Sequence, residues 1–368
     1  MRRPRVRHGI VWGLCLLVSW HGARAGEASD EFDRQRFRGG LEHEIRFRQA
    51  AIQVAWGAEP LCDDTTEIET FVLWSTSTLK KSLSAHEKAL FHQATGMDER
   101  WRIAWLDESA PDLLKPGQAV RAINGRALPG GETKFELSAV FRGTSPLTTD
   151  DLAFWEVVAK ARAEAHEGKP FVVTLDDGRT VEVPTQTGCS GSVTASAFDS
   201  EPEVFLRQEG ARSKIPGHAL MEARDRDEFR WLAAFGTYFL ASERALVKQQ
   251  TSDGMGNAFM IGKVLTVALP GAGALLAAVE AQTQRSIVVD GLVGGADLFA
   301  NEVVLALGGD PMAGTRLSDR LRAKGVKADV LVMSDFRRSN ADLHIRQLLE
   351  IERVRDAAER DGAAAKKP

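Results

Sequence analysis

The sequence has little tyrosine, few cysteines and no long uninterrupted hydrophobic run. Of its 368 residues, one is tyrosine and three are cysteine. Every stretch of about 20 residues contains a charge, a proline or a polar break, which excludes a protein with several membrane spans. With 43% hydrophobic residues, the chain is also too apolar to be disordered. At roughly 100–200 residues per domain, the length allows two domains, or one large domain with an insertion.

The chain also lacks an excess of basic residues. The net charge is −4, but residues 1–25 contain five arginines and no acidic residue. The remaining chain therefore has 42 basic and 51 acidic residues, a net charge of −9. Because nucleic-acid binding depends on neutralising phosphates with lysine and arginine, a chain this acidic has no general affinity for nucleic acid. We expect no nucleic-acid partner.

The first 25 residues have the pattern of an export signal. Four arginines within the first seven residues precede a short apolar segment from Ile10 to Trp20, and Ala23-Arg24-Ala25 follows. Small residues at positions −3 and −1 suit a cleavage site, and the apolar segment is short for a membrane span. The sequence predicts cleavage near Ala25 and a periplasmic or secreted protein. An uncleaved anchor is the alternative.

Cleavage of the signal would remove Cys15 and leave Cys62 and Cys189. An even number of cysteines in an oxidising compartment indicates a disulfide, so we expect these two to be bonded. The alternative is a nucleophilic Cys189, because it lies in the loop-like sequence Gly-Cys-Ser-Gly-Ser at 188–192. Ser190 is a weak candidate nucleophile, because a Gly-x-Ser-x-Gly motif needs glycine where this segment ends in serine.

Hydrophobic periodicity predicts helices on both sides of a β-rich segment. The predicted helices are 38–58, 82–95, 154–165, 224–250, 297–307, 311–323 and 340–361. Alternating apolar and polar residues predict strands at 102–106, 119–123, 171–175 and 180–183. The segment 258–280 is apolar but is interrupted by Lys263 and Pro270, which favours a packed hairpin or a flap rather than a span. Contact of this segment with a lipid surface is the alternative.

Residues 99–186 contain an ordered set of turn motifs. They begin with Leu114-Lys115-Pro116-Gly117, continue with Asn124-Gly125 between strands, and end with a hairpin around Asp177-Gly178. This order resembles a PDZ-like domain, in which Leu114, Pro116, Gly117, Asn124 and Gly125 belong to the loops. PDZ domains bind extended peptides by adding a strand to a sheet edge, so the resemblance implies a peptide or protein partner. The alternative is a small structural insertion.

A second set of motifs runs along nearly the whole chain after residue 25. In order, these motifs are Leu61-Cys62, Gly188-Cys189, Asp227-Glu228-Phe229, Ala296-Asp297, 305–311 and the segment from Ser334 to Arg355. They resemble the HtpX/BepA-like zinc metallopeptidases, the family of the CAAX prenyl endopeptidase, and in particular exported members with a PDZ-like insertion. The resemblance implies an α+β fold. A mainly helical peptidase-like domain (26–98 and 187–362) would contain the PDZ-like residues 99–186, with a tail at 363–368.

The zinc site of that family is missing from the sequence. Family members bind zinc through His-Glu-x-x-His on one helix, whose glutamate activates water, and through a glutamate on a second helix. In the same register this chain has Phe235, Gly236 and Phe239, and Val293 replaces the second-helix ligand. Only Asp297, which lies near the metal in the family, is retained. Phenylalanine and valine cannot bind zinc, so the resemblance implies no metal and no cofactor.

The sequence therefore indicates a pseudopeptidase, a metallopeptidase homologue that binds peptides or a partner in the cell envelope without hydrolysing them. Phe235 and Phe239 are expected to fill the space of the lost metal. The first alternative is an active zinc endopeptidase with ligands among the other histidines: His43, His86, His92, His166, His218 and His344. The second is an assembly protein whose helix at 340–361 packs on a partner.

Overall fold

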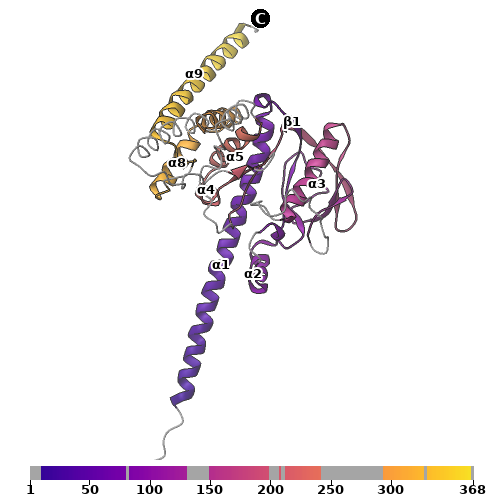
Figure 1. Cartoon of the computed structure of the whole chain (residues 1–368), viewed down its shortest axis with the longest axis vertical. Coiled ribbons are helices and arrows are strands. Elements are labelled where there is room, and N and C mark those ends of the chain that lie inside the picture. The colour runs from indigo at the N-terminus through magenta and orange to yellow at the C-terminus, as the bar shows by residue number, and fades with distance from the viewer. Residues whose placement is uncertain are drawn as a thin grey trace, which may run out of the picture.

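The computed structural model describes residues 10–79, 83–130, 149–198, 207–208, 212–241, 293–326 and 330–365. Within these ranges, long helices occur together with antiparallel sheets, so the expected α+β class is confirmed (Figure 1). The predicted segment 258–280 lies outside these ranges. Phe205 and Leu206, at the positions where the resemblance to metallopeptidases implies a strand along the cleft, also lie outside them. No helix of the described residues has the length and apolar character needed to cross a membrane.

Helix α1 (Ile10–Gly57) is a single helix of 48 residues whose N-terminal half extends away from the rest of the molecule in Figure 1. The helix predicted at 38–58 is confirmed and forms the second half of α1. The helix begins earlier, however, and includes the residues around Ala25 where cleavage is predicted. Its C-terminal half contacts both the helical part and the β-rich part of the chain. Helix α1 therefore connects the two parts.

The β-rich part is an antiparallel sheet covered by one long helix. Its main strands follow the order β2 (Phe71–Trp74), β3 (Trp101–Leu106), β4 (Ala119–Ile123), β6 (Phe171–Leu175) and β7 (Thr180–Val183). The short strand β5 (Arg126–Ala127) pairs with β4. Helix α3 (Thr149–His166) packs on the sheet, and the rings of Trp101 and Phe154 stack with centroids 3.9 Å apart. All four predicted strands and the predicted helix are confirmed.

The predicted turn residues of this part have the backbone that their types require. Asn124 and Gly125, with φ angles of 45° and 73°, form the tight turn between β4 and β5. Gly117 has a φ angle of 86°, and its N–H donates to the carbonyl of Ile103 at 2.7 Å. Leu114 is buried in the core of the sheet, whereas the neighbouring Pro116 is exposed. These residues shape loops of the sheet.

The expectation that residues 26–98 are helical is wrong for two segments. Strand β1 (Thr65–Glu69) pairs with β8 (Thr185–Cys189), and β2 belongs to the sheet that was predicted to begin after residue 98. The sheet therefore extends past the predicted boundary at 99. Strand β1 is polar, and β2 is a run of four buried residues without alternation, so neither has the two-residue period of a half-buried strand.

The region after Cys189 also contains strands that the sequence did not indicate. Strands β9 (Ser192–Ala195), β10 (Arg207–Gln208) and β11 (Arg212–Ile215) form a small sheet in the order β10-β11-β9, with β9 and β11 parallel. Each of these strands has at most four residues, which leaves too few positions for a pattern to be recognised. The region is mainly helical, as predicted, but the small sheet was not anticipated.

The described helices of this part include α5 (Arg226–Ala241), which packs on the small sheet. They are α4 (Gly217–Glu222), α5, a helix at 293–306, α8 (Ala313–Ala323) and α9 (Asp335–Ala365). Residues 242–250 of the predicted 224–250 helix lie outside the described residues. The main hydrophobic core lies between α1, the small sheet and these helices. The distal end of α9 extends away from it (Figure 1).

Short elements complete the fold near the junction of its two parts. Helix α2 (Ala85–Thr95) begins with a capping box, in which Ser84 and Glu87 each bond the other's backbone N–H. It ends at Gly96, which has a φ angle of 72°. Two 3-10 turns, η1 (Glu59–Leu61) and η2 (Thr76–Thr78), follow α1 and β2. The helix predicted at 82–95 is thus confirmed with a start three residues later.

Candidate functional site

The residues at the expected zinc positions form part of the hydrophobic core. Phe235 and Phe239, one turn apart on α5, are buried with their ring centroids 5.6 Å apart. Val293, at the start of the helix at 293–306, is 3% exposed and belongs to the same core. Tyr238 packs against this helix, because its ring centroid lies 5.7 Å from that of Phe299. Among the described residues, the expected zinc positions therefore form a packed apolar core.

Gly236 is the residue that the sequence resemblance places at the position of the catalytic glutamate. A Cβ atom built on Gly236 would lie 2.6 Å from Cγ1 of Val193, which comes from strand β9. The hydroxyl oxygen of Ser213, from β11, would lie 3.3 Å away. Helix α5 thus approaches the small sheet so closely that even a methyl group forces a displacement. A glutamate side chain has no space at this position in the observed packing.

We expect Gly236→Ala to lower the free energy of unfolding by about 1–3 kcal/mol, because it overpacks the contact between α5 and β9. Alanine normally stabilises a helix relative to glycine, so a loss would show that packing outweighs helix propensity. Gly294→Ala is the matched control, because nothing lies within 4 Å of a Cβ built there. Urea unfolding of both variants is the measurement. Equal or higher stability of Gly236→Ala would contradict the close approach.

Asp297, which the sequence resemblance identifies as a retained residue of the zinc site, forms a buried ion pair. Its two carboxylate oxygens accept from Nε and Nη2 of Arg337, each at 2.8 Å. Asp297 is 1% exposed and Arg337 is 4% exposed. Arg337 Nη1 also donates to the carbonyl of Val330 at 2.7 Å. This pair joins the helix at 293–306 to the first turn of α9, so Asp297 has a structural role in this chain.

The donor set of the described residues does not fit a zinc ion. The expected positions carry phenylalanine, glycine and valine, which have no side-chain lone pair. Across the part of the chain that the structure describes, no three His, Cys, Asp or Glu side chains are grouped as metal ligands would be. Four of the other histidines instead contact nearby oxygens: His43 (Gly39), His86 (Asp30), His92 (Met97) and His344 (Glu302).

Cys62 and Cys189 form a disulfide, as predicted, with their Cα atoms 5.6 Å apart. The alternative of a nucleophilic Cys189 is therefore wrong, because its sulfur is already bonded. The bond joins the end of η1 to the end of β8. The neighbouring Ser190 donates from its hydroxyl to Asp64 at 2.7 Å in an exposed position. The disulfide ties the end of β8 to the turn that follows α1, and the Ser190–Asp64 bond joins the segments that flank β8 and β1.

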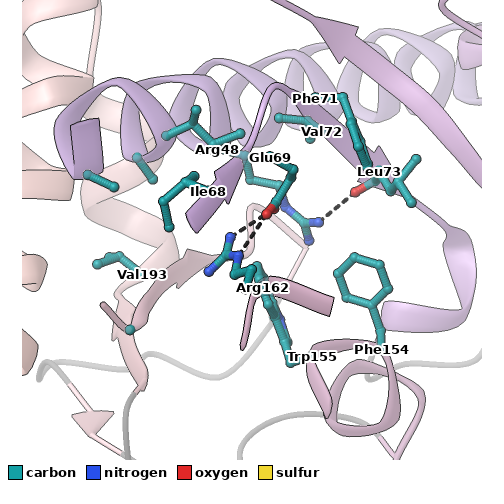
Figure 2. Close-up of a pocket in the computed structure, with 14 residues that line it drawn as sticks. Arg48, Ile68, Glu69, Phe71, Val72, Leu73, Phe154, Trp155, Arg162 and Val193 are labelled. Carbon is teal, nitrogen blue, oxygen red and sulfur yellow. Dashed lines mark hydrogen bonds and ion pairs between the residues drawn. The ribbon is translucent and has the colours of Figure 1, made fainter. Parts of the chain in front are cut away.

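A cavity of about 60 Å³ lies where α1, β2, α3 and β9 meet (Figure 2). Its walls are mainly apolar and include Ile52, Ile68, Val72 and Trp155. Three charged side chains also line the cavity: Arg48, Glu69 and Arg162. Nε and Nη2 of Arg162 donate to the carboxylate of Glu69 at 2.7 and 2.8 Å. The cavity thus combines apolar walls with a net positive charge.

Arg48 projects from α1 to the outer strand of the described sheet. Its Nη1 donates to the carbonyl of Leu73 in β2 at 2.9 Å. Its Nε is buried and has no hydrogen-bond acceptor among the described atoms. Glu44 lies one helical turn before Arg48 and accepts from Trp74 Nε1 and from the N–H of Ala197, each at 2.7 Å. Burial raises the pKa of the Glu44 carboxyl, against the opposing effect of these bonds and of Arg48.

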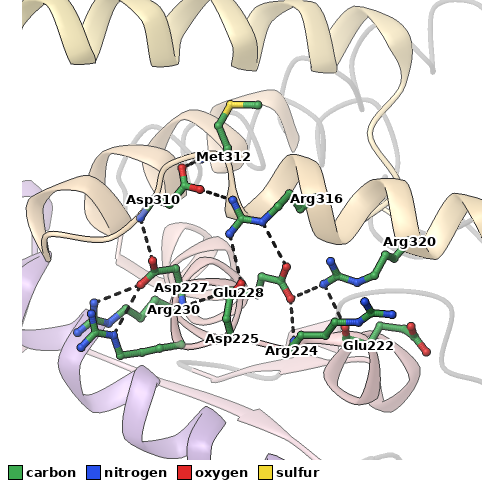
Figure 3. A network of polar contacts seen from close by, with 11 residues as sticks. Glu222, Arg224, Asp225, Asp227, Glu228, Arg230, Asp310, Met312, Arg316 and Arg320 are labelled. Carbon is green, nitrogen blue, oxygen red and sulfur yellow. Dashed lines mark hydrogen bonds and ion pairs between the residues drawn. The ribbon is translucent and has the colours of Figure 1, made fainter.

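A network of ion pairs joins two of the sequence motifs (Figure 3). Asp227, at the start of α5, accepts from the N–H of Asp310 at 2.9 Å. The next residue, Glu228, is 1% exposed and accepts from Arg320 of α8 and from the N–H of Arg224. The motifs at 227–229 and 305–311 thus meet in space. Their role in the structure is to fix α5 against α8.

Sequence reasoning did not single out Arg48, Glu44, Glu69 or Arg162. Arg48 and Glu44 lie within the helix that the sequence predicts at 38–58. Their spacing of four residues places both on one side of that helix, which is the only local signal they offer. Glu69 lies in β1, which was not predicted, so its pairing with Arg162 of α3 could not be anticipated. The cavity therefore had no signature in the sequence.

Comparison with known proteins leaves the family open: no protein-family model, no curated protein and no solved structure matches this chain.

Proposed function

We propose that this protein is a non-catalytic binding protein with a metallopeptidase-like architecture, a pseudopeptidase that binds extended peptides or a protein partner in the cell envelope. The close approach at Gly236 carries the proposal. Where a zinc peptidase needs a glutamate to activate water, this chain has no space for one. The replacement of three ligands by buried apolar residues supports the same conclusion.

The order of the elements supports the architecture that we propose. A helix that packs on a small sheet (α5), followed by a second helix at 293–306, corresponds to the two ligand-bearing helices of the family. The inserted sheet, with β2 as an outer strand and α3 across it, suits a PDZ-like module. The Cys62–Cys189 disulfide is compatible with a periplasmic or secreted location.

The proposal is tested by metal content, peptidase activity and peptide binding in one preparation. The mature protein is purified without a chelator or an affinity-tag metal, analysed for zinc, and incubated with casein and added zinc. We expect substoichiometric zinc, no cleavage, and binding of unfolded peptides at micromolar concentration. One zinc per chain with casein cleavage would establish the active zinc endopeptidase instead. Absence of peptide binding at high micromolar concentration would refute the peptide-binding role.

A further inference from the structure

Helix α9 has a row of apolar side chains that are exposed to solvent. Phe336, Leu343, Ile351 and Val354 are 63, 53, 65 and 60% exposed. At about 100° per residue, their spacing places all four within about 80° of the helix circumference. A row of exposed apolar side chains on one side of a helix is typical of an interaction surface. We call these four residues the apolar stripe of α9.

The opposite side of α9 packs against the body of the protein. Ala341 and Ile345 lie on that side and are buried, at 0 and 2% exposed. The buried ion pair between Arg337 and Asp297 also holds the first turn of the helix in place. The distal end then extends away from the body (Figure 1). The apolar stripe therefore has a fixed direction and is accessible at each of its four residues.

The charges beside the apolar stripe differ between its two borders. One border has Arg346, Glu350 and Arg353, which are all exposed. The other border has the half-buried His344 and the exposed Arg355. Two parallel helices bring unlike borders together, whereas two antiparallel helices bring each border against its own copy. A parallel pair of α9 helices would therefore place basic residues together, and an antiparallel pair would place acidic residues beside basic ones.

We propose that α9 binds α9 of a second copy of this chain, as an antiparallel pair around a two-fold axis at Gln347. Residues equally far before and after Gln347 then face each other, and each contact forms twice. Leu343 faces Ile351 of the second copy. Arg346 lies beside Glu350 of the second copy, which gives a contact between opposite charges on each side of the axis. The two Gln347 amides meet at the axis, where one can donate a hydrogen bond to the other.

The charges favour a second copy over a lipid surface as the partner of the apolar stripe. Helices that lie on a membrane surface are rich in lysine and arginine on their polar side. Glu350 lies directly beside the stripe and pairs with Arg353 of the same helix at 3.5 Å. Both side chains are exposed, so they can exchange partners at little cost. The pairing of two copies is independent of the peptide-binding function proposed above.

Sedimentation equilibrium of the mature protein across the micromolar range tests the pairing. We expect a monomer–dimer equilibrium in which Leu343→Glu raises the dissociation constant about tenfold or more, because it places a charge within the apolar contact. Leu113→Glu is the matched control. Leu113 is a leucine of the β-rich part with 60% exposure, so the same substitution changes charge and polarity outside α9. Circular dichroism of each variant confirms that it is folded.

Two charge variants test the antiparallel arrangement. Arg346→Glu alone and Glu350→Arg alone each place like charges together across the axis, so each should dimerise more weakly than the wild type. In a heterodimer of the two variants, both contacts again join opposite charges, although neither chain carries both changes. We therefore expect a mixture of the two variants to associate more tightly than either variant alone.

A protein that is monomeric throughout this concentration range would overturn the proposal, including the case in which another segment of the chain covers the apolar stripe. Equal dissociation constants for Leu343→Glu and Leu113→Glu would also overturn it, because the dimer would then form elsewhere. If Leu343→Glu weakens the dimer but the mixture associates no better than the single variants, the antiparallel arrangement is wrong.

Discussion

Replacement of Cys62 and Cys189 by serine is expected to lower the free energy of unfolding by about 5 kcal/mol. The two cysteines are 127 residues apart, so the bond closes a very long loop. On the chain-entropy account, a cross-link stabilises mainly by restricting the unfolded chain, and the effect increases with the logarithm of loop length. A loss of this size is comparable to the entire stability of many domains.

Chemical unfolding of the oxidised wild type and of the double serine variant measures this difference. A reducing agent should destabilise the wild type by a similar amount and leave the serine variant unchanged. This second comparison separates loss of the cross-link from any effect of serine in the buried position of Cys189. An unchanged denaturation midpoint in the serine variant would show that the disulfide contributes little.

Arg337→Met is expected to destabilise the protein by about 3–5 kcal/mol, because it leaves the carboxylate of Asp297 buried without its counter-ion. Asp297 is 1% exposed, so water cannot replace the lost guanidinium without local opening. The matched control is Arg338→Met at the next position. Arg338 pairs with Asp319 at the surface, and such pairs contribute about 1 kcal/mol or less.

Removal of both charges in Asp297→Leu with Arg337→Met should recover most of the lost stability, since a buried ion pair can be replaced by apolar side chains at little cost. Thermal unfolding of the two single variants and the double variant gives the coupling energy directly. If Arg337→Met lowers the free energy of unfolding no more than Arg338→Met does, the Asp297–Arg337 pair is not buried as described. Hydrogen exchange along α9 would show whether that helix detaches when the pair is broken.

The parts of the fold that the sequence predicted are those whose signals are local. Strand β7 alternates clearly between exposed and buried residues, and the Asn124-Gly125 and Asp177-Gly178 turns have preferred hairpin residues. The capping residues Ser84 and Glu87 are also visible in the sequence, and they place the start of α2 more accurately than periodicity does. In these cases, a few consecutive residues decide the structure.

The parts that the sequence missed depend on contacts between distant residues. Strand β1 forms only because β8, about 120 residues later, provides its hydrogen-bond partners. The burial of Phe235 and Phe239 follows from their apolar side chains, but the close approach at Gly236 depends on Val193 in another element. Arg48 is one charged residue among many on α1, and only its position beside Leu73 distinguishes it. Such pairings have no local signature.

The disulfide also determines how tension would pass through the molecule. A pulling force applied at the two ends of the chain would be transmitted from α1 through the bonded sulfurs of Cys62 and Cys189 directly to the segment that follows β8. The inserted sheet would then carry no load and would remain folded while the helical part is extended. Reduction would release the 127-residue separation as added contour length, roughly 400 Å of extended chain, and would expose the sheet to the force.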